Sequence, residues 1–178
     1  MASSTALLLV DAQVNMFAPD AAVYRGEEML ATLRDLVERA RSAGVPVIYI
    51  QNNGGPDEPD LPGTPGWEIH PDLAPRPDDI VIQKHTPNSF YQTPLLETLR
   101  QRDITALVIA GMQTEYCIDT TTRQAAALDF AVTLVADGHS TYDTSTLTAA
   151  QVIAHHNAVL RAFARVIPAA DISGQLGS

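Results

Sequence analysis

The chain has 178 residues, of which 46% are hydrophobic and 18% are charged, a balance typical of a single globular domain over residues 1–178. Its 11 basic and 21 acidic residues give a formal net charge of −10, which opposes binding to nucleic-acid phosphates. One cysteine permits no intrachain disulfide, and the apolar runs are too short to cross a membrane. The N-terminus lacks the basic region of a secretory signal, so we expect a cytoplasmic protein.

The first half of the chain alternates short apolar runs with helical periodicity, the pattern of βαβ units around a parallel sheet. Its expected elements are, in chain order, a strand at 5–10, a helix at 27–42, strands at 47–51 and 80–83, and a short helix at 93–101. The segment 52–79 is rich in Gly, Pro and Asp and is too long for a routine connection, which indicates a functional or disordered loop. Trp67, the only tryptophan, lies within it and favours a packed loop.

The second half of the chain continues this alternation. Its expected elements are a strand at 106–110, a helix at 115–129, a strand at 132–135, a helix at 148–163 and a short strand at 166–167. Thr114 is the predicted N-cap of the helix at 115–129, and the polar run 137–140 is a predicted turn. Because no internal repeat or second domain is present, the elements predict a three-layer, doubly wound α/β fold with a mainly parallel six-stranded sheet.

Three chemically active side chains stand at the ends of expected strands. Asp11 follows the first strand, Lys84 follows the third, and Cys117 comes after the fourth. Because ligands of open α/β sheets bind at the carboxyl ends of the strands, these side chains are predicted to meet in one crevice. Taken singly, each has a plainer interpretation: Asp11 as the cap of a turn, Lys84 as a solvated lysine, and Cys117 as a small buried hydrophobic residue.

Cys117 lies where a buried strand is predicted to turn into a helix. On the first turn of that helix, the helix dipole and the free backbone N–H groups would favour the thiolate, which is the nucleophilic form. An acid, a base and a thiol at corresponding strand ends therefore favour a cysteine-nucleophile enzyme.

Several motifs of the chain are similar to those of a known family. The most specific runs from Val108 to Cys117, VIAGMQTEYC, and continues with Asp119-Thr120-Thr121. The other segments are Leu7–Gln13 with Phe17, Lys84 with Ser89-Phe90 and Thr93–Leu95, and Asp137–Thr141. Over roughly residues 5–167 the chain resembles the isochorismatase-like cysteine hydrolases, a superfamily that includes nicotinamidases and N-carbamoylsarcosine amidohydrolases.

The resemblance implies a strand order of 3-2-1-4-5-6 and a catalytic triad of Asp11, Lys84 and Cys117. In that triad Asp11 would accept the thiol proton, Lys84 would hold positive charge beside both groups, and the Cys117 thiolate would attack a carbonyl carbon. The resemblance also places oxyanion-hole donors at the backbone N–H groups of Gln113 and Cys117. It implies a cis peptide bond between Met112 and Gln113.

The chain departs from the nicotinamidases of that superfamily at their metal site. Those enzymes carry an Asp-x-His pair after the second strand and a further histidine, whereas this chain has Gln51-Asn52-Asn53 there. His70 and His85 are scattered and lack a third ligand. The adjacent His155 and His156 point about 100° apart on a helix and cannot share a metal. No glycine-rich nucleotide-binding loop follows the first strand, so we expect neither a metal nor another cofactor.

Candidate substrate contacts lie near strand ends or in the long loop: Phe17, Tyr24, Trp67, Asn88, Gln113 and Tyr116. Core packing is the alternative for Phe17 and Trp67, because large aromatic side chains bury area wherever they can.

These observations predict cofactor-independent hydrolysis of a C–N bond in a small amide, lactam or ureide through a Cys117 thioester. One alternative is isochorismatase-type hydrolysis of a vinyl ether, in which Asp11 would donate a proton and no thioester would form. Another alternative is a catalytically silent binding or assembly protein on the same fold. Relatives commonly assemble, so a homo-oligomer is expected.

Overall fold

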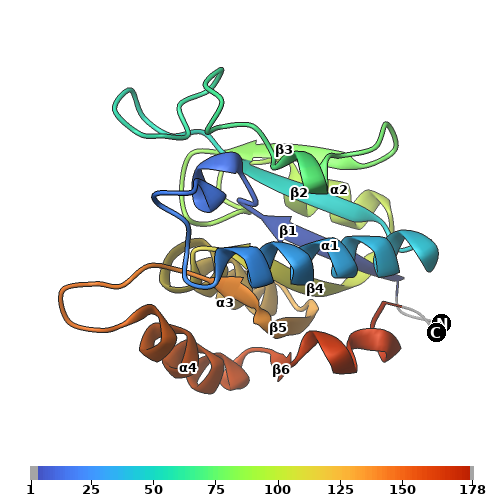
Figure 1. Cartoon of the computed structure of the whole chain (residues 1–178). Coiled ribbons are helices and arrows are strands. Elements are labelled where there is room, and N and C mark those ends of the chain that lie inside the picture. Colours follow the sequence, from blue (N-terminus) through green and yellow to red (C-terminus); the bar gives the residue numbers. More distant parts are fainter. Residues whose placement is uncertain (1–3, 177–178) are drawn as a thin grey trace.

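A six-stranded sheet forms the centre of the molecule in the computed structural model, which describes residues 4–176 (Figure 1). Its strands are β1 Ser4–Val10, β2 Val47–Asn52, β3 Ile80–Lys84, β4 Ile104–Met112, β5 Ala131–Ser140 and β6 Arg165–Ile167. They lie in the order β3-β2-β1-β4-β5-β6, and every neighbouring pair is parallel. The predicted fold class and strand order are confirmed, and the sheet is parallel throughout.

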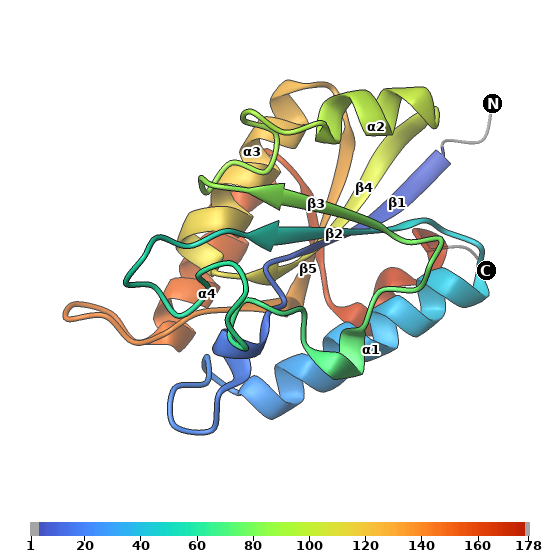
Figure 2. The same cartoon turned by 90° about the horizontal axis from the view of Figure 1, so that it is seen from above.

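Helices cover both faces of the sheet and give the three layers that Figure 2 shows from above. α1 Gly26–Ser42 packs on one face, whereas α2 Leu95–Gln101 and α3 Asp119–Ala127 pack on the other. α4 Ala149–Val159 contacts β5 and the segment Thr114–Ile118. No helix within residues 4–176 combines the length and the apolar character needed to cross a bilayer.

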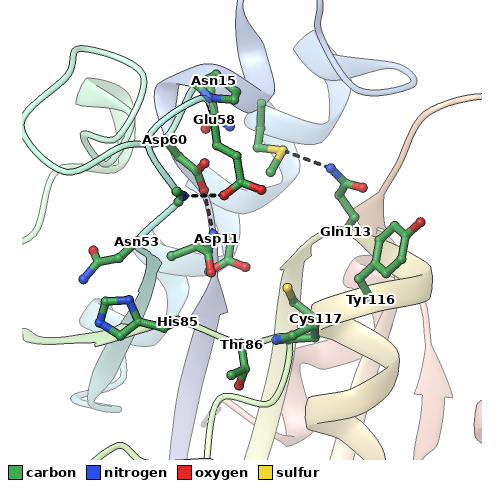
Figure 3. Close-up of a pocket in the computed structure, with 16 residues that line it drawn as sticks. Asp11, Asn15, Asn53, Glu58, Asp60, His85, Thr86, Gln113, Tyr116 and Cys117 are labelled. Carbon is green, nitrogen blue, oxygen red and sulfur yellow. Dashed lines mark hydrogen bonds between the residues drawn. The ribbon is translucent and has the colours of Figure 1, made fainter.

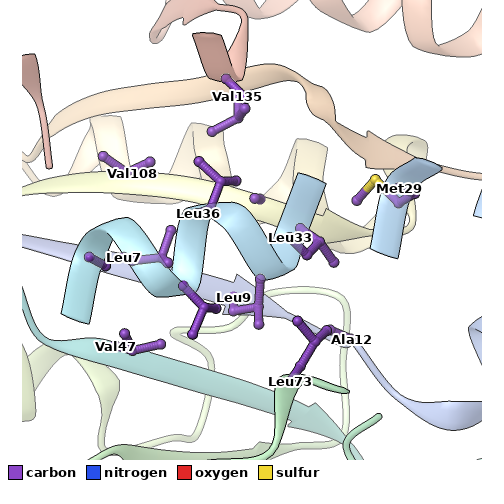
Figure 4. Packing of buried hydrophobic residues seen from close by; sticks show 14 of the residues in the cluster. Leu7, Leu9, Ala12, Met29, Leu33, Leu36, Val47, Leu73, Val108 and Val135 are labelled. Atoms are coloured by element: carbon purple, nitrogen blue, oxygen red, sulfur yellow. The ribbon is translucent and has the colours of Figure 1, made fainter. Parts of the chain in front are cut away.

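The first strand is apolar at successive positions because the sheet buries both of its faces. Leu7 and Leu9 pack on the α1 side, whereas Leu8 and Val10 pack on the side of α2 and α3. All four side chains are fully buried. The residues of α1 that meet this face recur at three- and four-residue steps, as Figure 4 shows for several of them: Met29, Leu33, Leu36, Val37 and Ala40.

The predicted turn at 137–140 is wrong, because this polar run continues β5. Its pairing with β4 shifts register between Ile109 and Gly111, and beyond the shift Gly111 pairs with His139 and Met112 with Ser140. Ser140 is buried, and its hydroxyl donates to the Tyr24 carbonyl oxygen at 2.6 Å. Partners for the buried polar groups thus allow a polar sequence to form a strand.

Gly111 stands at this register shift with a φ of 130°, which residues with a side chain rarely adopt. A Cβ there would lie 1.9 Å from the carbonyl oxygen of Val10 in β1. We therefore expect Gly111→Ala to lower the free energy of unfolding by more than about 3 kcal/mol, measured by chemical denaturation. The matched control is Gly63→Ala, at a φ of 85° in open space, with an expected loss of about 1–2 kcal/mol. Equal losses at the two glycines would contradict the steric argument.

The segment between β2 and β3 is a packed loop held by two buried glutamines. The Gln13 Nε2 group donates to the carbonyl oxygens of Asn52 and Trp67 at 3.0 and 2.9 Å, and its Oε1 accepts from the Asn52 N–H at 2.8 Å. Gln51 Nε2 donates to the same Trp67 carbonyl at 2.9 Å. The Trp67 indole N–H donates to Asn53 Oδ1 at 2.7 Å. These bonds fix the loop at the carboxyl ends of β1 and β2.

Candidate active site

Asp11, Lys84 and Cys117 converge at the carboxyl end of the sheet, as the sequence predicts. Asp11 directly follows β1, Lys84 is the last residue of β3, and Cys117 lies on the turn that follows β4. The Lys84 Nζ atom lies 2.8 Å from Asp11 Oδ2 and 3.3 Å from Cys117 Sγ. One ammonium group therefore contacts both the acid and the thiol.

Within the part of the chain that the structure describes, the buried Lys84 ammonium has three hydrogen-bond partners. Besides Asp11 and Cys117, it donates to Asn52 Oδ1 at 2.9 Å. Burial acts to lower the pKa of Lys84, but the charge of Asp11 and the hydrogen bonds to Asp11 and Cys117 outweigh it and raise the pKa. Lys84 is therefore a fixed cation.

Asp11 is 1% exposed and adopts a left-handed conformation, with a φ of 49°. Burial raises the pKa of its carboxyl group above the ordinary value, although the Lys84 charge acts in the opposite direction. Its second oxygen, Oδ1, is buried and has no hydrogen-bond partner among residues 4–176. A carboxylate with a raised pKa and a free oxygen is suited to accept a proton.

The electrostatics of Cys117 differ from the expectation of a resting thiolate. Burial, followed by the charge of Asp11, raises the pKa of the Cys117 thiol to about 12, although Lys84 acts to lower it. The cysteine also lies within a π-helical turn, Thr114–Ile118, in which the Ile118 N–H donates to the Gln113 carbonyl at 3.1 Å. The resting group is therefore a thiol, and a base must remove its proton during the reaction.

The turn that carries Cys117 is anchored by a buried histidine. Thr114 is not the N-cap that its position predicts; it lies inside the turn, and its hydroxyl contacts His139 Nδ1 at 2.9 Å. His139 Nε2 contacts Asn157 Oδ1 at 3.0 Å, and Asn157 Nδ2 donates to the Ala136 carbonyl oxygen at 2.9 Å. Asn157 Oδ1 is thus an acceptor, which assigns the ring proton to Nε2 and lets Nδ1 accept from Thr114.

This network predicts a pH-dependent stability. Burial lowers the pKa of His139 from 6.5 to about 4. Between these two pH values the histidine is protonated in the unfolded chain but neutral in the folded protein. The free energy of unfolding therefore has its full value above pH 6.5 with respect to His139, and it decreases as the pH falls from 6.5 towards 4. We expect wild type to lose about 2 kcal/mol more than His139→Gln in the free energy of unfolding between pH 7 and pH 5, measured with urea. Equal losses in the two proteins would contradict a neutral His139.

A cavity of about 640 Å³ opens in front of the nucleophile, and the Cys117 sulfur points into it (Figure 3). Its wall comes from four parts of the chain: residues near the end of β1, the loop at 52–60, residues 85–87, and residues 113–117. Parts of the chain that are distant in sequence thus enclose one space beside the three converging side chains.

Two of the predicted substrate contacts, Gln113 and Tyr116, line this cavity. Tyr116 is exposed, whereas the Gln113 Nε2 group lies 3.9 Å from Met16 Sδ. The peptide bond between Met112 and Gln113 is cis, as the family resemblance implies.

The other four predicted contacts do not line the cavity and have other surroundings. Phe17 meets the His70 ring edge-on, with ring centroids 5.2 Å apart, and Trp67 supports the loop through its bond to Asn53. Tyr24 borders a separate hollow between α1 and β5. The Asn88 amide accepts from the Phe90 N–H at 2.9 Å and contacts the Gln124 side chain at 3.4 Å.

Several polar residues of the cavity wall were not predicted as contacts: Asn15, Asn52, Asn53, Glu58, Asp60, His85 and Thr86. The composition of the loop at 52–79 pointed to function, but only its folding shows which of its side chains face the cavity. His85 is on this wall and His70 is not, and among residues 4–176 no three His, Cys, Asp or Glu side chains gather as a metal site would require.

The chain matches the model of the isochorismatase domain over residues 5–171. The chain belongs to the isochorismatase family. An isochorismatase from Pseudomonas putida KT2440 superimposes on it with a TM-score of 0.88 and 30% sequence identity, over 94% of this chain and 89% of the other.

Two hydrolases are also similar to this chain in sequence. A streptothricin hydrolase from Streptomyces noursei is 39% identical over 138 residues, which cover 78% of this chain and 55% of the relative. A ureidoacrylate amidohydrolase from Stutzerimonas stutzeri is 32% identical over 76% of this chain and 69% of that protein. The chain spans about half the length of the streptothricin hydrolases that it matches.

Proposed function

We propose that this protein is a cysteine hydrolase that cleaves a C–N bond of a small amide, lactam or ureide through a thioester on Cys117. The observation that carries the proposal is the placement of Lys84 Nζ between Asp11 Oδ2 and Cys117 Sγ, at 2.8 and 3.3 Å, beside a cavity. A thiol, a base and a fixed cation are the groups that covalent hydrolysis of a carbonyl compound needs.

The proposed reaction begins with attack of the sulfur on the carbonyl carbon while the thiol proton passes to Asp11. When the C–N bond breaks, Asp11 returns this proton to the leaving nitrogen, and the acyl group stays on Cys117 as a thioester. Asp11 then takes a proton from water as the water oxygen attacks the thioester, and the Cys117 thiol is restored with release of the acid. Side chains and water account for every bond and proton, so no cofactor enters the scheme.

The tetrahedral intermediates carry a negative oxygen that needs hydrogen-bond donors. We assign these donors to the backbone N–H groups of Gln113, which directly precedes the π-helical turn, and Cys117, which lies within it. Both residues belong to the cavity wall, which supports this assignment. The cation of Lys84 adds positive charge beside the reacting sulfur and favours the thiolate as it forms.

The names of two relatives also support hydrolysis, and one of them supports C–N bond hydrolysis. One is named a ureidoacrylate amidohydrolase, which specifies hydrolysis of an amide-type bond, and the other a streptothricin hydrolase, which specifies hydrolysis. The test is a panel of small amides, lactams and ureides, with detection of the released amine, ammonia or ring-opened product. Turnover of at least one member that is absent in Cys117→Ala supports the proposal, whereas cleavage restricted to vinyl ethers would replace it.

A further inference from the structure

The cavity carries more negative charge than the triad accounts for. Glu58 and Asp60 line it, whereas no Lys or Arg among residues 4–176 does. The Lys84 cation lies against Asp11, so these two charges offset each other. Neither Glu58 nor Asp60 forms an ion pair within the described part of the chain. The wall therefore has two carboxylates whose charge no protein cation balances.

Asp60 is 6% exposed, and within residues 4–176 its carboxylate has one hydrogen-bond partner. Its Oδ2 accepts from Asn52 Nδ2 at 2.7 Å, and the Oδ1 of the same Asn52 amide is occupied by Lys84. Because a buried carboxylate without a cation is costly, such a group at a ligand cavity points to a cation supplied from outside the chain. Figure 3 shows the Glu58 and Asp60 side chains close together above Asp11.

The wall also offers acceptor oxygens that have no donor. Asn15 Oδ1 is buried and lacks a hydrogen-bond partner among residues 4–176, and Asn15 lines the cavity. Glu58 accepts a bond from the Gly55 N–H through Oε2, which leaves Oε1 open in the described structure. Unpaired buried acceptors favour a ligand with several N–H groups.

The backbone of the loop leaves space for these carboxylates. A Cβ at Gly54 would lie 2.2 Å from Asp60 Oδ1, so the Asp60 carboxylate rests directly against a glycine. The Gly54 N–H donates to the Asp60 carbonyl oxygen at 2.9 Å, which closes the turn that carries both acids.

We propose that Glu58 and Asp60 select substrates that carry a protonated amine or a guanidinium group near the scissile C–N bond. The cationic group binds at these two carboxylates while the carbonyl carbon faces Cys117. This inference rests on the proposed function, since it names the substrate class of the same cavity. An organic cation supplies both the charge and the donors that the wall lacks.

Binding to the Cys117→Ala protein tests the inference without any need for turnover. The probes are 4-aminobutanamide and pentanamide, which differ only in an ammonium group in place of a methyl group, titrated by NMR. We expect the ammonium compound to bind at least about tenfold more tightly. Adding Glu58→Gln or Asp60→Asn reduces this preference. Asp57→Asn, which removes an exposed carboxylate of the same loop outside the cavity wall, leaves it unchanged.

Any of three results would overturn the inference. The two probes could bind with equal dissociation constants, the ammonium probe could fail to bind, or the preference for it could survive both substitutions. Glu58 is exposed, so Glu58→Gln is expected to fold even if the buried Asp60→Asn does not. A hydrolase without cation preference would refute only the inference. A cation-selective protein without a Cys117-dependent activity would refute only the proposed function.

Discussion

Cys117→Ala is expected to lower kcat/KM by at least about 10⁴-fold on any substrate that the protein hydrolyses. Cys117 is the only thiol in the chain, and its sulfur points into the cavity beside Lys84 and Asp11. Without the sulfur no thioester can form, and the remaining groups can only polarise the carbonyl group or activate water. Steady-state kinetics with the substrate found in the amide, lactam and ureide panel measures the loss.

The fold is expected to survive this substitution, because Cys117 is only partly buried and removing its sulfur leaves the strands intact. Thermal unfolding and circular dichroism of Cys117→Ala and Cys117→Ser provide the control. If activity is lost while the circular dichroism spectrum is unchanged, the loss comes from the missing sulfur and not from unfolding. An alanine variant within tenfold of wild type would contradict the covalent mechanism.

Lys84→Met is expected to remove both stability and activity. It leaves Asp11 buried without its cation, which costs about 3–5 kcal/mol in the free energy of unfolding when one partner of a buried ion pair is removed. It also removes the positive charge beside Cys117, for which we expect a loss of at least about 10³-fold in kcat/KM. Urea denaturation and steady-state kinetics measure the two effects.

The matched variant is the double substitution Asp11→Asn with Lys84→Met. It removes both charges, so it should recover part of the lost stability without recovering activity. Recovery of stability alone separates the structural effect of the ion pair from its chemical effect. If Lys84→Met were as stable as wild type, the Asp11–Lys84 pair would not have the energetic role that its burial implies.

The parts of the fold that follow from sequence are those governed by apolar pattern. Leu7 to Val10 are apolar at every position because both faces of β1 are covered, and α1 repeats its apolar residues at helical spacing. The ends of these strands then bring Asp11, Lys84 and Cys117 to one edge. Local pattern predicted the strand ends and their shared edge, and the family resemblance supplied the strand order that brings the three side chains together.

Tertiary hydrogen bonds decide what the sequence could not show. The polar run that ends β5 looked like a turn, but His139 and Ser140 find partners in Asn157 and Tyr24 and stay in the strand. Thr114 is a residue type that commonly caps a helix N-terminus, but its hydroxyl forms a hydrogen bond with His139 Nδ1 instead. Such choices depend on residues that are distant in sequence.

The protonation state of Cys117 could not be predicted from its neighbours in the sequence. A cysteine after a strand and before a helix suggests a stabilised thiolate, but burial and the neighbouring Asp11 charge raise the pKa of Cys117 to about 12. The side chains that line the cavity depend likewise on the packing of residues 52–79, where Glu58 and Asp60 line the cavity and Trp67 does not.

The most direct test of the central claim is mass spectrometry of the protein quenched with acid during turnover of its substrate. We predict a protein species heavier by the mass of the acyl group, with the adduct located on Cys117 by peptide mapping, and no such species in Cys117→Ala. A substrate that is fully turned over with no acyl adduct under any quench time, or with an adduct on another residue, would contradict a Cys117 thioester.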